Sequence, residues 1–319
     1  KPRNSSQKHA GVALYFQPMS ASPLRSLLHR FFPFLAVLGS VTALGIGTSW
    51  AKHWLFPVVG AQGTTAVRVG FSALLVLLLW RPWRWSLPVA DRRSVLLFGM
   101  SLGLMNLLFY MSLRTIPFGI AVAIEFVGPL SVAIWGSRRR TEWIWLALAM
   151  AGLAMLLPLG LSAGVPLDPE GVAYALGAAV CWGAYIVFGK RLGQLHAGHS
   201  VALGLTVAAL TVFPIGAWHA GAALWDPQVL LYGLGVAAVS SAIPISLEMV
   251  AMKRLSHSAF GIMTSTEPAV AALLGMWILG EHLAIQQWLA IGCIMGAAAG
   301  SALTSQPHAA DEDPSDLLH

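Results

Sequence analysis

The sequence predicts an all-α membrane protein with ten transmembrane helices, arranged as two inverted five-helix repeats. Three observations lead to this prediction. The 319 residues are 57% hydrophobic and only 10% charged, whereas soluble domains carry about 25% charged residues. Apolar stretches recur along the whole chain with short polar connections between them. A motif around Glu125 in the first half returns around Glu267 in the second half.

A membrane-spanning helix needs about 20 mostly apolar residues. The stretches of this kind are residues 32–52, 62–80, 94–113, 118–136, 142–161, 170–190, 199–219, 228–250, 258–279 and 284–304. The first one follows a basic segment, as in a signal peptide, but it is long enough to span a bilayer and no cleavage site follows it. We therefore expect a disordered N-terminal segment (1–30), a first repeat (31–161), a second repeat (170–304) and a disordered acidic tail (305–319).

The basic residues mark one side of the predicted membrane. All but three of the 19 lysines and arginines fall on the side where both chain ends lie, and the exceptions are Lys52, Arg68 and Arg114. Basic loops stay in the cytoplasm, so we expect both termini to lie in the cytoplasm. The net charge of +6 follows from these loops. It indicates a lipid bilayer rather than nucleic acid as the partner.

Glu125 and Glu267 lie near the middle of their predicted helices. Gly128-Pro129 follows the first glutamate, Pro268 follows the second, and several neighbours share the same 142-residue spacing (125 to 267). An ionisable residue at this depth costs ~2.5–3.5 kcal/mol, so it is expected to face a cavity or a partner. The functional interpretation is recognition of a substrate amine, proton exchange, or both. The alternative is a structural polar contact between helices.

Six further side chains in predicted helices are candidates for the same cavity. They are Arg68, Asn106, Tyr110, Trp182, Tyr185 and Glu248. The asparagine and the glutamate correspond at the 142-residue spacing, although the glutamate could also be solvated near the helix end. The arginine could hold a glutamate or a substrate carboxylate, or reach the outer interface. The aromatic faces could stabilise an ammonium group, although aromatic residues inside helices more often pack.

Two features concern the organisation of the helices. An odd number of helices in each repeat turns the second copy upside down, and transporters built this way bind substrate near the midplane between the halves. Small residues at every fourth position, from Gly39 to Ala51 and from Gly292 to Gly300, permit close helix contact within the chain or in a homodimer.

Motifs for enzymatic chemistry are missing from the sequence. It has no P-loop and no His-Glu-x-x-His sequence, and its two cysteines lack metal-ligand spacing. We therefore expect neither an enzyme nor a cofactor or metal.

Four short motifs carry a resemblance to a known family. They are Ala51-Lys-His-Trp-Leu-Phe-Pro57, Gly119-Ile-Ala-Val-Ala-Ile-Glu-Phe-Val-Gly-Pro129, Ser246-Leu-Glu-Met249 and Thr266-Glu-Pro268. With them, residues 31–304 resemble the EamA family of the drug/metabolite transporter superfamily, and more specifically its branch that exports small amino acids such as threonine and homoserine. The resemblance implies proton-driven export, with an amino acid and protons as partners.

The favoured interpretation is an exporter that works by alternating access around a midplane cavity. Three alternatives stay open. The first is an exporter of lipophilic cations or other drugs and metabolites, and the second is a facilitator without proton coupling. The third is a membrane scaffold or sensor subunit that transports nothing, although the short loops offer a partner little surface.

Overall fold

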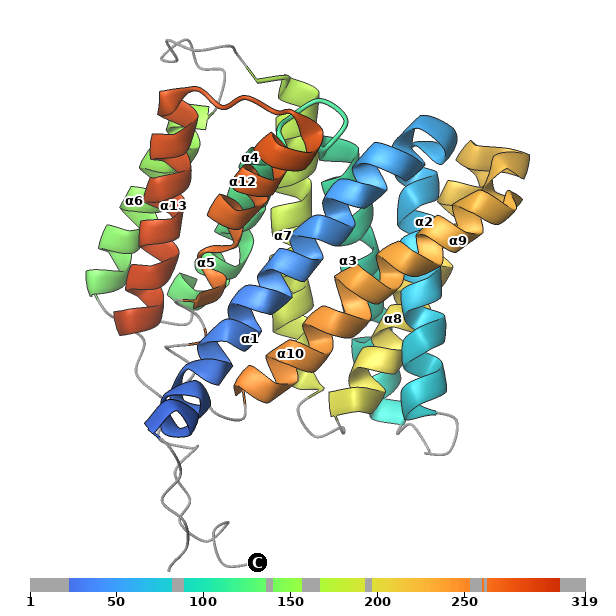
Figure 1. Cartoon of the computed structure of the whole chain (residues 1–319), viewed down its shortest axis with the longest axis horizontal. Helices are drawn as coiled ribbons and strands as arrows, with labels where there is room; N and C mark the ends of the chain where they lie inside the picture. Colours follow the sequence, from blue (N-terminus) through green and yellow to red (C-terminus); the bar gives the residue numbers. More distant parts are fainter. Residues whose placement is uncertain are drawn as a thin grey trace, which may run out of the picture.

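A computed structural model describes residues 23–81, 89–135, 140–156, 167–192, 197–252, 260 and 263–304. Every regular element within these residues is helical, and Figure 1 shows the helices side by side between an upper and a lower end. Four helical stretches are long and apolar enough to cross a membrane: Phe32–Trp80, Arg92–Ser112, Pro169–Arg191 and Gly198–Trp225. The prediction of an all-α fold with membrane-spanning apolar helices is confirmed, while the ten-helix inverted arrangement stays a prediction.

The first half begins with two helices that are joined without a loop. Its elements are α1 (Pro23–Trp50), the π-helical turn η1 (Ala51–Leu55), α2 (Phe56–Trp80), α3 (Val89–Ser112), α4 (Phe118–Glu125), α5 (Val127–Trp135) and α6 (Arg140–Leu156). The sequence predicts a gap between residues 52 and 62, but η1 continues the helix there. Pro57 is tolerated because it lies in the first turn of α2, where its missing N–H has no partner to lose. The chain bends at Gly60, whose φ of 67° glycine adopts readily.

The second half, like the first, contains a π-helical turn. Its elements are α7 (Pro169–Arg191), α8 (Ala197–Ala220), the 3₁₀ turn η3 (Gly221–Trp225), α9 (Pro227–Ala237), the π-helical turn η4 (Ala238–Ala242), α10 (Ile243–Met252), α12 (Glu267–Leu279) and α13 (Ile285–Thr304). Asp168 and Asp226 cap α7 and α9, because their carboxylates accept hydrogen bonds from the backbone N–H groups of Gly171 and Gln228. Most of residues 258–262, the start of the ninth predicted helix, lie outside the described residues.

Helices of the two halves pack against one another. The contacting pairs include α1 with α10, α2 with α8, α3 with α7, α4 with α12, and α6 with α13, and α3 also packs extensively on α8. One hydrophobic core lies among α4, α6, α7, α12 and α13, and another lies among η1, α2, α3, α8 and α9. Helices from both halves contribute to each core, so neither half is packed by itself.

Small residues set the closest helix contacts. A Cβ atom added at Gly119 of α4 would lie 2.6 Å from the Cα atom of Ala272 in α12. On α1, an added Cβ would meet Leu247 from Gly39 and Ser240 from Gly47. The predicted stripe of small residues on α1 therefore contacts α10 and η4. The stripe on α13 differs along its length, because Gly300 is packed against Trp145 of α6, whereas an added Cβ at Gly292 would meet no atom within 4 Å.

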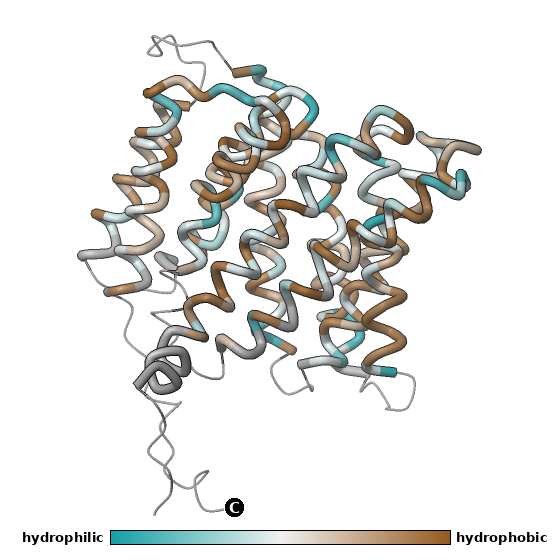
Figure 2. The backbone as a smooth tube through the Cα atoms, in the orientation of Figure 1, coloured by the Kyte–Doolittle hydropathy of each residue, from teal (hydrophilic) through white to brown (hydrophobic). Residues whose placement is uncertain are grey.

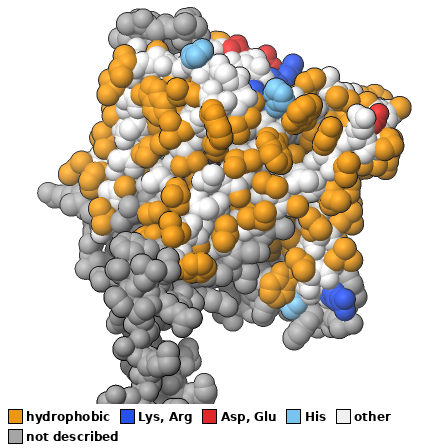
Figure 3. Space-filling view, viewed as in Figure 1, with side chains coloured by type: hydrophobic (Ala, Val, Ile, Leu, Met, Phe, Trp, Pro, Cys, Tyr) orange, Lys and Arg blue, Asp and Glu red, His pale blue; other side chains and the backbone are white. Residues whose placement is uncertain are grey.

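The outer surface of the helices is apolar. Hydrophobic residues run along most of the helical tube in Figure 2, and orange side chains cover much of the face in Figure 3 between charged groups at its upper and lower edges. Large apolar side chains such as Leu79 (72% exposed) and Trp218 (92% exposed) lie on this surface. In water such exposure would be unfavourable, whereas lipid chains are its natural solvent.

Candidate functional site

A cavity of about 580 Å³ lies between helices of the two halves. Its walls come from α1, α2, α3, α4 and α5 of the first half and from α7, α8, η4, α10 and α12 of the second half. Seven of the eight residues that the sequence singled out line it. They are Arg68, Asn106, Glu125, Trp182, Tyr185, Glu248 and Glu267. The eighth, Tyr110, is fully buried behind the wall.

Glu125 and Glu267 both lie where a helix is interrupted. Glu125 is the last residue of α4, and the single residue Phe126, which keeps right-handed helical dihedral angles, separates α4 from α5. Glu267 is the first residue of α12 and follows the turn at Ser265 and Thr266. Interrupted backbone at membrane depth is tolerated where it lines a cavity or is buried in protein. The local sequence explains the breaks, because Pro129 and Pro268 cannot donate the hydrogen bonds of a continuous helix.

Arg68 is fixed in the cavity wall by contacts with three residues, two from α3 and one from η4. Its Nε–H donates to the hydroxyl of Ser240 at 2.9 Å, and its Nη1–H donates to Oδ1 of Asn106 at 2.5 Å. The guanidinium carbon lies 5.4 Å from the centroid of the Tyr110 ring, a distance at which the π face attracts the cation. Arg68 is therefore held inside the protein and does not extend to the membrane surface. Because guanidinium carries five N–H donors, these two bonds leave others for a ligand.

The ionisable side chains of the cavity form an electrostatic series. The charges of Arg68 and Glu267 act on Glu125, and the charge of Glu248 acts on Glu267. Glu248 also accepts a hydrogen bond of 2.8 Å from the hydroxyl of Ser40 in α1. Among the described lining residues, three carboxyl groups thus face one guanidinium and no lysine. Carboxylates crowded in this way require a bound cation or a proton to offset their mutual repulsion.

Within the described ranges, no group of three or more His, Cys, Asp or Glu side chains could hold a metal ion. Carboxyl groups without enough positive partners attract an ammonium group or protons.

Two aromatic residues of α7 that line the cavity contact other aromatic rings. Trp182 meets Phe126 edge to face with centroids 5.2 Å apart, and Tyr185 stacks on Phe98 at 4.6 Å. Both side chains are half-buried and line the cavity. They narrow it on the side of α7 and leave part of their surface for a ligand.

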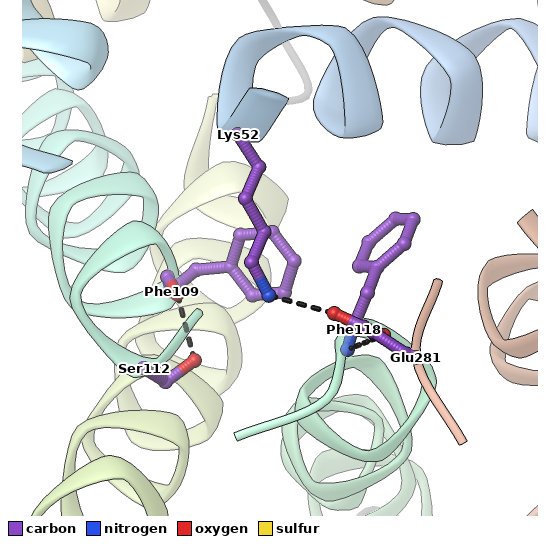
Figure 4. A network of polar contacts seen from close by, with 5 residues as sticks. All are labelled: Lys52, Phe109, Ser112, Phe118 and Glu281. Atoms are coloured by element: carbon purple, nitrogen blue, oxygen red, sulfur yellow. Dashed lines mark hydrogen bonds and ion pairs between the residues drawn. The ribbon is translucent and has the colours of Figure 1, made fainter. Parts of the chain in front are cut away.

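An ion pair at one end of the cavity was missed by sequence reasoning, which interpreted Lys52 only as a helix end. Its Nζ lies 2.7 Å from Oε1 of Glu281, whose other oxygen accepts a 2.8 Å hydrogen bond from the backbone N–H of Phe118 (Figure 4). Glu281 thereby joins η1 and the start of α4 to the segment between α12 and α13. The rings of Phe109 and Phe118 meet beside this contact, 6.3 Å apart. The available signal was weak: Glu281 is the one acidic residue between Glu267 and the acidic tail.

Comparisons with known proteins agree with this architecture. Residues 169–303 match the EamA-like transporter family. The chain is 47% identical over 274 residues to the threonine/homoserine exporter RhtA of Escherichia coli (strain K12), an alignment that covers 86% of this chain and 92% of that protein. The RhtA protein of Salmonella typhimurium (strain LT2) gives the same identity and coverage. The uncharacterized inner membrane transporter YedA of Escherichia coli (strain K12) is 29% identical over 192 residues, covering 58% of this chain and 61% of YedA.

A solved crystal structure is similar in fold. It superposes with a TM-score of 0.52 over 85% of this chain and 99% of that chain, at 19% sequence identity. This likeness concerns the arrangement of helices, whereas the relationship by descent rests on the 47% identity over most of the sequence. The chain therefore belongs to the EamA-like transporter family.

Proposed function

We propose that the chain exports small zwitterionic amino acids, threonine and homoserine among them, across the bacterial inner membrane. The observation that carries the proposal is the 47% identity, over 86% of the chain, to a protein named for threonine and homoserine export. The chemistry of the cavity supports the same substrate class.

The polar groups of the cavity suit a zwitterion. Arg68 presents a positive charge from α2, while Glu125 and Glu267 present carboxyl groups from α4 and α12. An amino acid carries an ammonium and a carboxylate on neighbouring atoms, so it can bridge these two walls. The free N–H donors of Arg68 would bind the carboxylate, and the glutamates would bind the ammonium. The volume of about 580 Å³ lies within the range of small-molecule pockets.

The excess of carboxyl groups supports proton coupling. When a substrate ammonium leaves the cavity, Glu125, Glu267 and Glu248 lose the cation that offset their charges. A proton from the outside can then take its place, and its release to the cytoplasm restores the site for the next ammonium. The residues thus act in turn as binding groups for substrate and proton, and no covalent step is needed.

The packing of the helices supports two inverted repeats over residues 31–161 and 170–304. If the first five predicted spans correspond in order to the last five, the pairs α2–α8, α4–α12 and α6–α13 each join equivalent helices. The remaining pairs, α1–α10 and α3–α7, exchange with each other under the same correspondence. This pattern is what a pseudo-two-fold axis in the membrane plane would produce. Both termini are proposed to lie in the cytoplasm, and homodimerisation stays a prediction.

The contact of Lys52 with Glu281 suggests which end of the cavity is closed. It joins helices of both halves near Phe109 and Phe118, which line the cavity at that end. By the charge distribution of the loops, this end faces away from the cytoplasm. Alternating access would then require this ion pair to open when the substrate is released outward.

Substrate-resolved efflux from lipid vesicles tests the proposal. The purified protein is reconstituted, the vesicles are loaded with threonine, homoserine or tetraphenylphosphonium, and efflux is followed with and without an acidic exterior. We expect protein-dependent efflux of both amino acids that the pH gradient accelerates. Efflux of tetraphenylphosphonium alone would favour the exporter of lipophilic cations. Amino-acid efflux indifferent to the gradient would favour the facilitator, and no efflux at all would favour the scaffold.

A further inference from the structure

The hydroxyls of two serines form a hydrogen bond with each other in the cavity wall near Arg68. Ser72 lies in α2 and Ser241 lies in the π-helical turn η4, with their Oγ atoms 2.7 Å apart. Both residues line the cavity. Ser72 follows Arg68 by four residues, so the two side chains lie on the same face of α2 with Cβ atoms about 5–6 Å apart. Ser241 directly follows Ser240, which accepts the hydrogen bond from Arg68.

The hydrogen-bonding capacity of this pair is not used up. A hydroxyl has one donor and two acceptor sites. Ser240 is fully engaged as a donor, because its hydroxyl donates to the carbonyl of Val236 at 2.7 Å while accepting from Arg68. Between Ser72 and Ser241, one proton lies in their shared bond, and the other hydroxyl proton has no protein acceptor among the described residues. The pair can therefore donate one hydrogen bond into the cavity and accept others from it.

The π-helical turn η4 places the hydroxyl of Ser241 beside that of Ser72. A π-helical turn inserts an extra residue into the helix and redirects the side chains that follow, and such turns are frequent at functional sites. In η4, Ser240 points to the guanidinium and the next residue, Ser241, reaches the hydroxyl of Ser72. In an ordinary α-helix, consecutive side chains point about 100° apart. In η4, by contrast, the consecutive residues Ser240 and Ser241 both contact α2. The turn thus brings two consecutive serines to one wall.

We propose that Ser72 and Ser241 recognise the side-chain hydroxyl of the transported amino acid and select hydroxyl-bearing substrates over apolar ones of the same size. This inference rests on the proposed function. With the carboxylate at Arg68, the side chain of the substrate extends one helical turn along α2, which is where Ser72 lies. Threonine and valine differ by a hydroxyl in place of a methyl group. A site that donates to a substrate hydroxyl discriminates against the isostere, because its own polar groups would be left unpaired.

Relative efflux of threonine and valine from reconstituted vesicles tests this inference. We expect the full chain to export threonine faster than valine, and the double variant S72A/S241A to lower the threonine-to-valine ratio by about tenfold or more, the scale of one lost hydrogen bond in a buried site. The variant S241T retains a hydroxyl and is expected to keep the ratio. Ser131, which bonds only to the carbonyl of Val127 on an exposed face of α5, provides the matched control S131A, which is also expected to keep it.

The outcomes separate this inference from the function on which it rests. If the unaltered protein exports neither threonine nor homoserine, the proposed function fails. If it exports both and S72A/S241A leaves the threonine-to-valine ratio unchanged, or slows both amino acids equally, the serine pair does not select the hydroxyl while the proposed function stands. Equal thermal unfolding temperatures of S72A/S241A and S131A would assign a change of ratio to recognition rather than to folding.

Discussion

Glu125 and Glu267 occupy corresponding positions in the two halves of the sequence, yet their surroundings differ. Glu125 is the last residue of α4, and the positive charge of Arg68 acts on it. Glu267 is the first residue of α12, and the negative charge of Glu248 acts on it. The N-terminus of a helix carries a partial positive charge, so α12 itself helps to hold a carboxylate at Glu267. The positive charge of Arg68 thus acts on Glu125, and the partial positive charge at the start of α12 acts on Glu267.

This difference supports different roles for Glu125 and Glu267. In the proposed function, a substrate that bridges Arg68 and an acidic group is expected to bind at Glu125, on which the charge of the guanidinium acts. Glu267 stands between Glu125 and Glu248 in the electrostatic series, which is the place for a proton that moves along the acidic groups. A repeated motif therefore does not imply a repeated role.

The largest effect is expected from E125Q. It removes the charge opposite Arg68 but keeps the size of the side chain, so it should raise the KM for threonine by about 10- to 100-fold, the value of a hydrogen bond to a charged group. Initial rates of efflux over a range of internal threonine concentrations measure this. Glu170, exposed in the first turn of α7, provides the control E170Q. An unaltered KM in E125Q would show that this glutamate does not bind the substrate.

The next effect concerns the contact between the helices that carry the two glutamates. In G119A the new methyl group of α4 would meet the backbone of Ala272 in α12, so we expect a loss of stability of about 1–3 kcal/mol, as for other overpacked sites. Thermal unfolding in detergent measures it. G292A serves as the control because its added Cβ meets no atom within 4 Å. Equal unfolding temperatures for G119A and G292A would contradict the close packing of α4 on α12.

A smaller effect is expected at the closed end of the cavity. E281Q weakens the bond to Lys52, and because the two side chains are 13% and 22% exposed, the contribution is about 1 kcal/mol or less. The cavity should therefore open more often toward that end, by about fivefold at most. The rate at which a membrane-impermeant thiol reagent modifies T48C, with the native cysteines replaced by alanine, reports this opening.

Lys190 provides the control for E281Q, because it lies exposed in the last turn of α7. K190Q should leave the rate of T48C modification unchanged. If E281Q and K190Q behave alike, the ion pair of Lys52 does not hold the cavity closed.

The smallest effect is expected at Asp168, which caps α7 outside the membrane. A hydrogen bond from Thr115, and further bonds from the backbone N–H groups of Gly171 and Glu170, hold the pKa of this carboxyl below its ordinary value. The carboxylate therefore stabilises the fold above the pKa it has in the unfolded chain, and this stabilisation is lost as the pH falls through the lower, folded-state pKa.

D168N should consequently unfold at a slightly lower temperature than the unaltered protein at neutral pH, and the difference should vanish once the pH lies below both the folded-state and the unfolded-state pKa of Asp168. Thermal unfolding at the two pH values checks this. A difference that persists in acid would show that the charge of Asp168 is not its cause.

The apolar helices and the ionisable residues of the cavity could be predicted from local sequence. Apolar runs mark the helices, and a glutamate within such a run is conspicuous because of its cost in lipid. The positions of the two helix breaks could be predicted only roughly. Pro129 and Pro268 indicate weakened helices, but they do not show that α4 ends at Glu125 or that α12 begins at Glu267. The turns η1 and η4 carried no recognisable signal, because π-helical turns depend on packing more than on composition.

Contacts between distant residues lay beyond sequence reasoning for a physical reason. Lys52 and Glu281 are separated by 229 positions, and Ser72 and Ser241 by 169. Periodicity reports which face of a helix is apolar, but it does not report which helix lies opposite. Both contacts depend on how the two halves pack together.

The most direct test of the central claim is homoserine efflux from vesicles with an acidic exterior, compared between the unaltered protein, E267Q and the double variant E125Q/E267Q. The account predicts that the gradient accelerates efflux through the unaltered protein. It predicts that E267Q still releases homoserine down its own concentration gradient but no longer responds to pH, and that the double variant does neither. Efflux at the unaltered rate in E125Q/E267Q, with the same acceleration by the pH gradient, would contradict it.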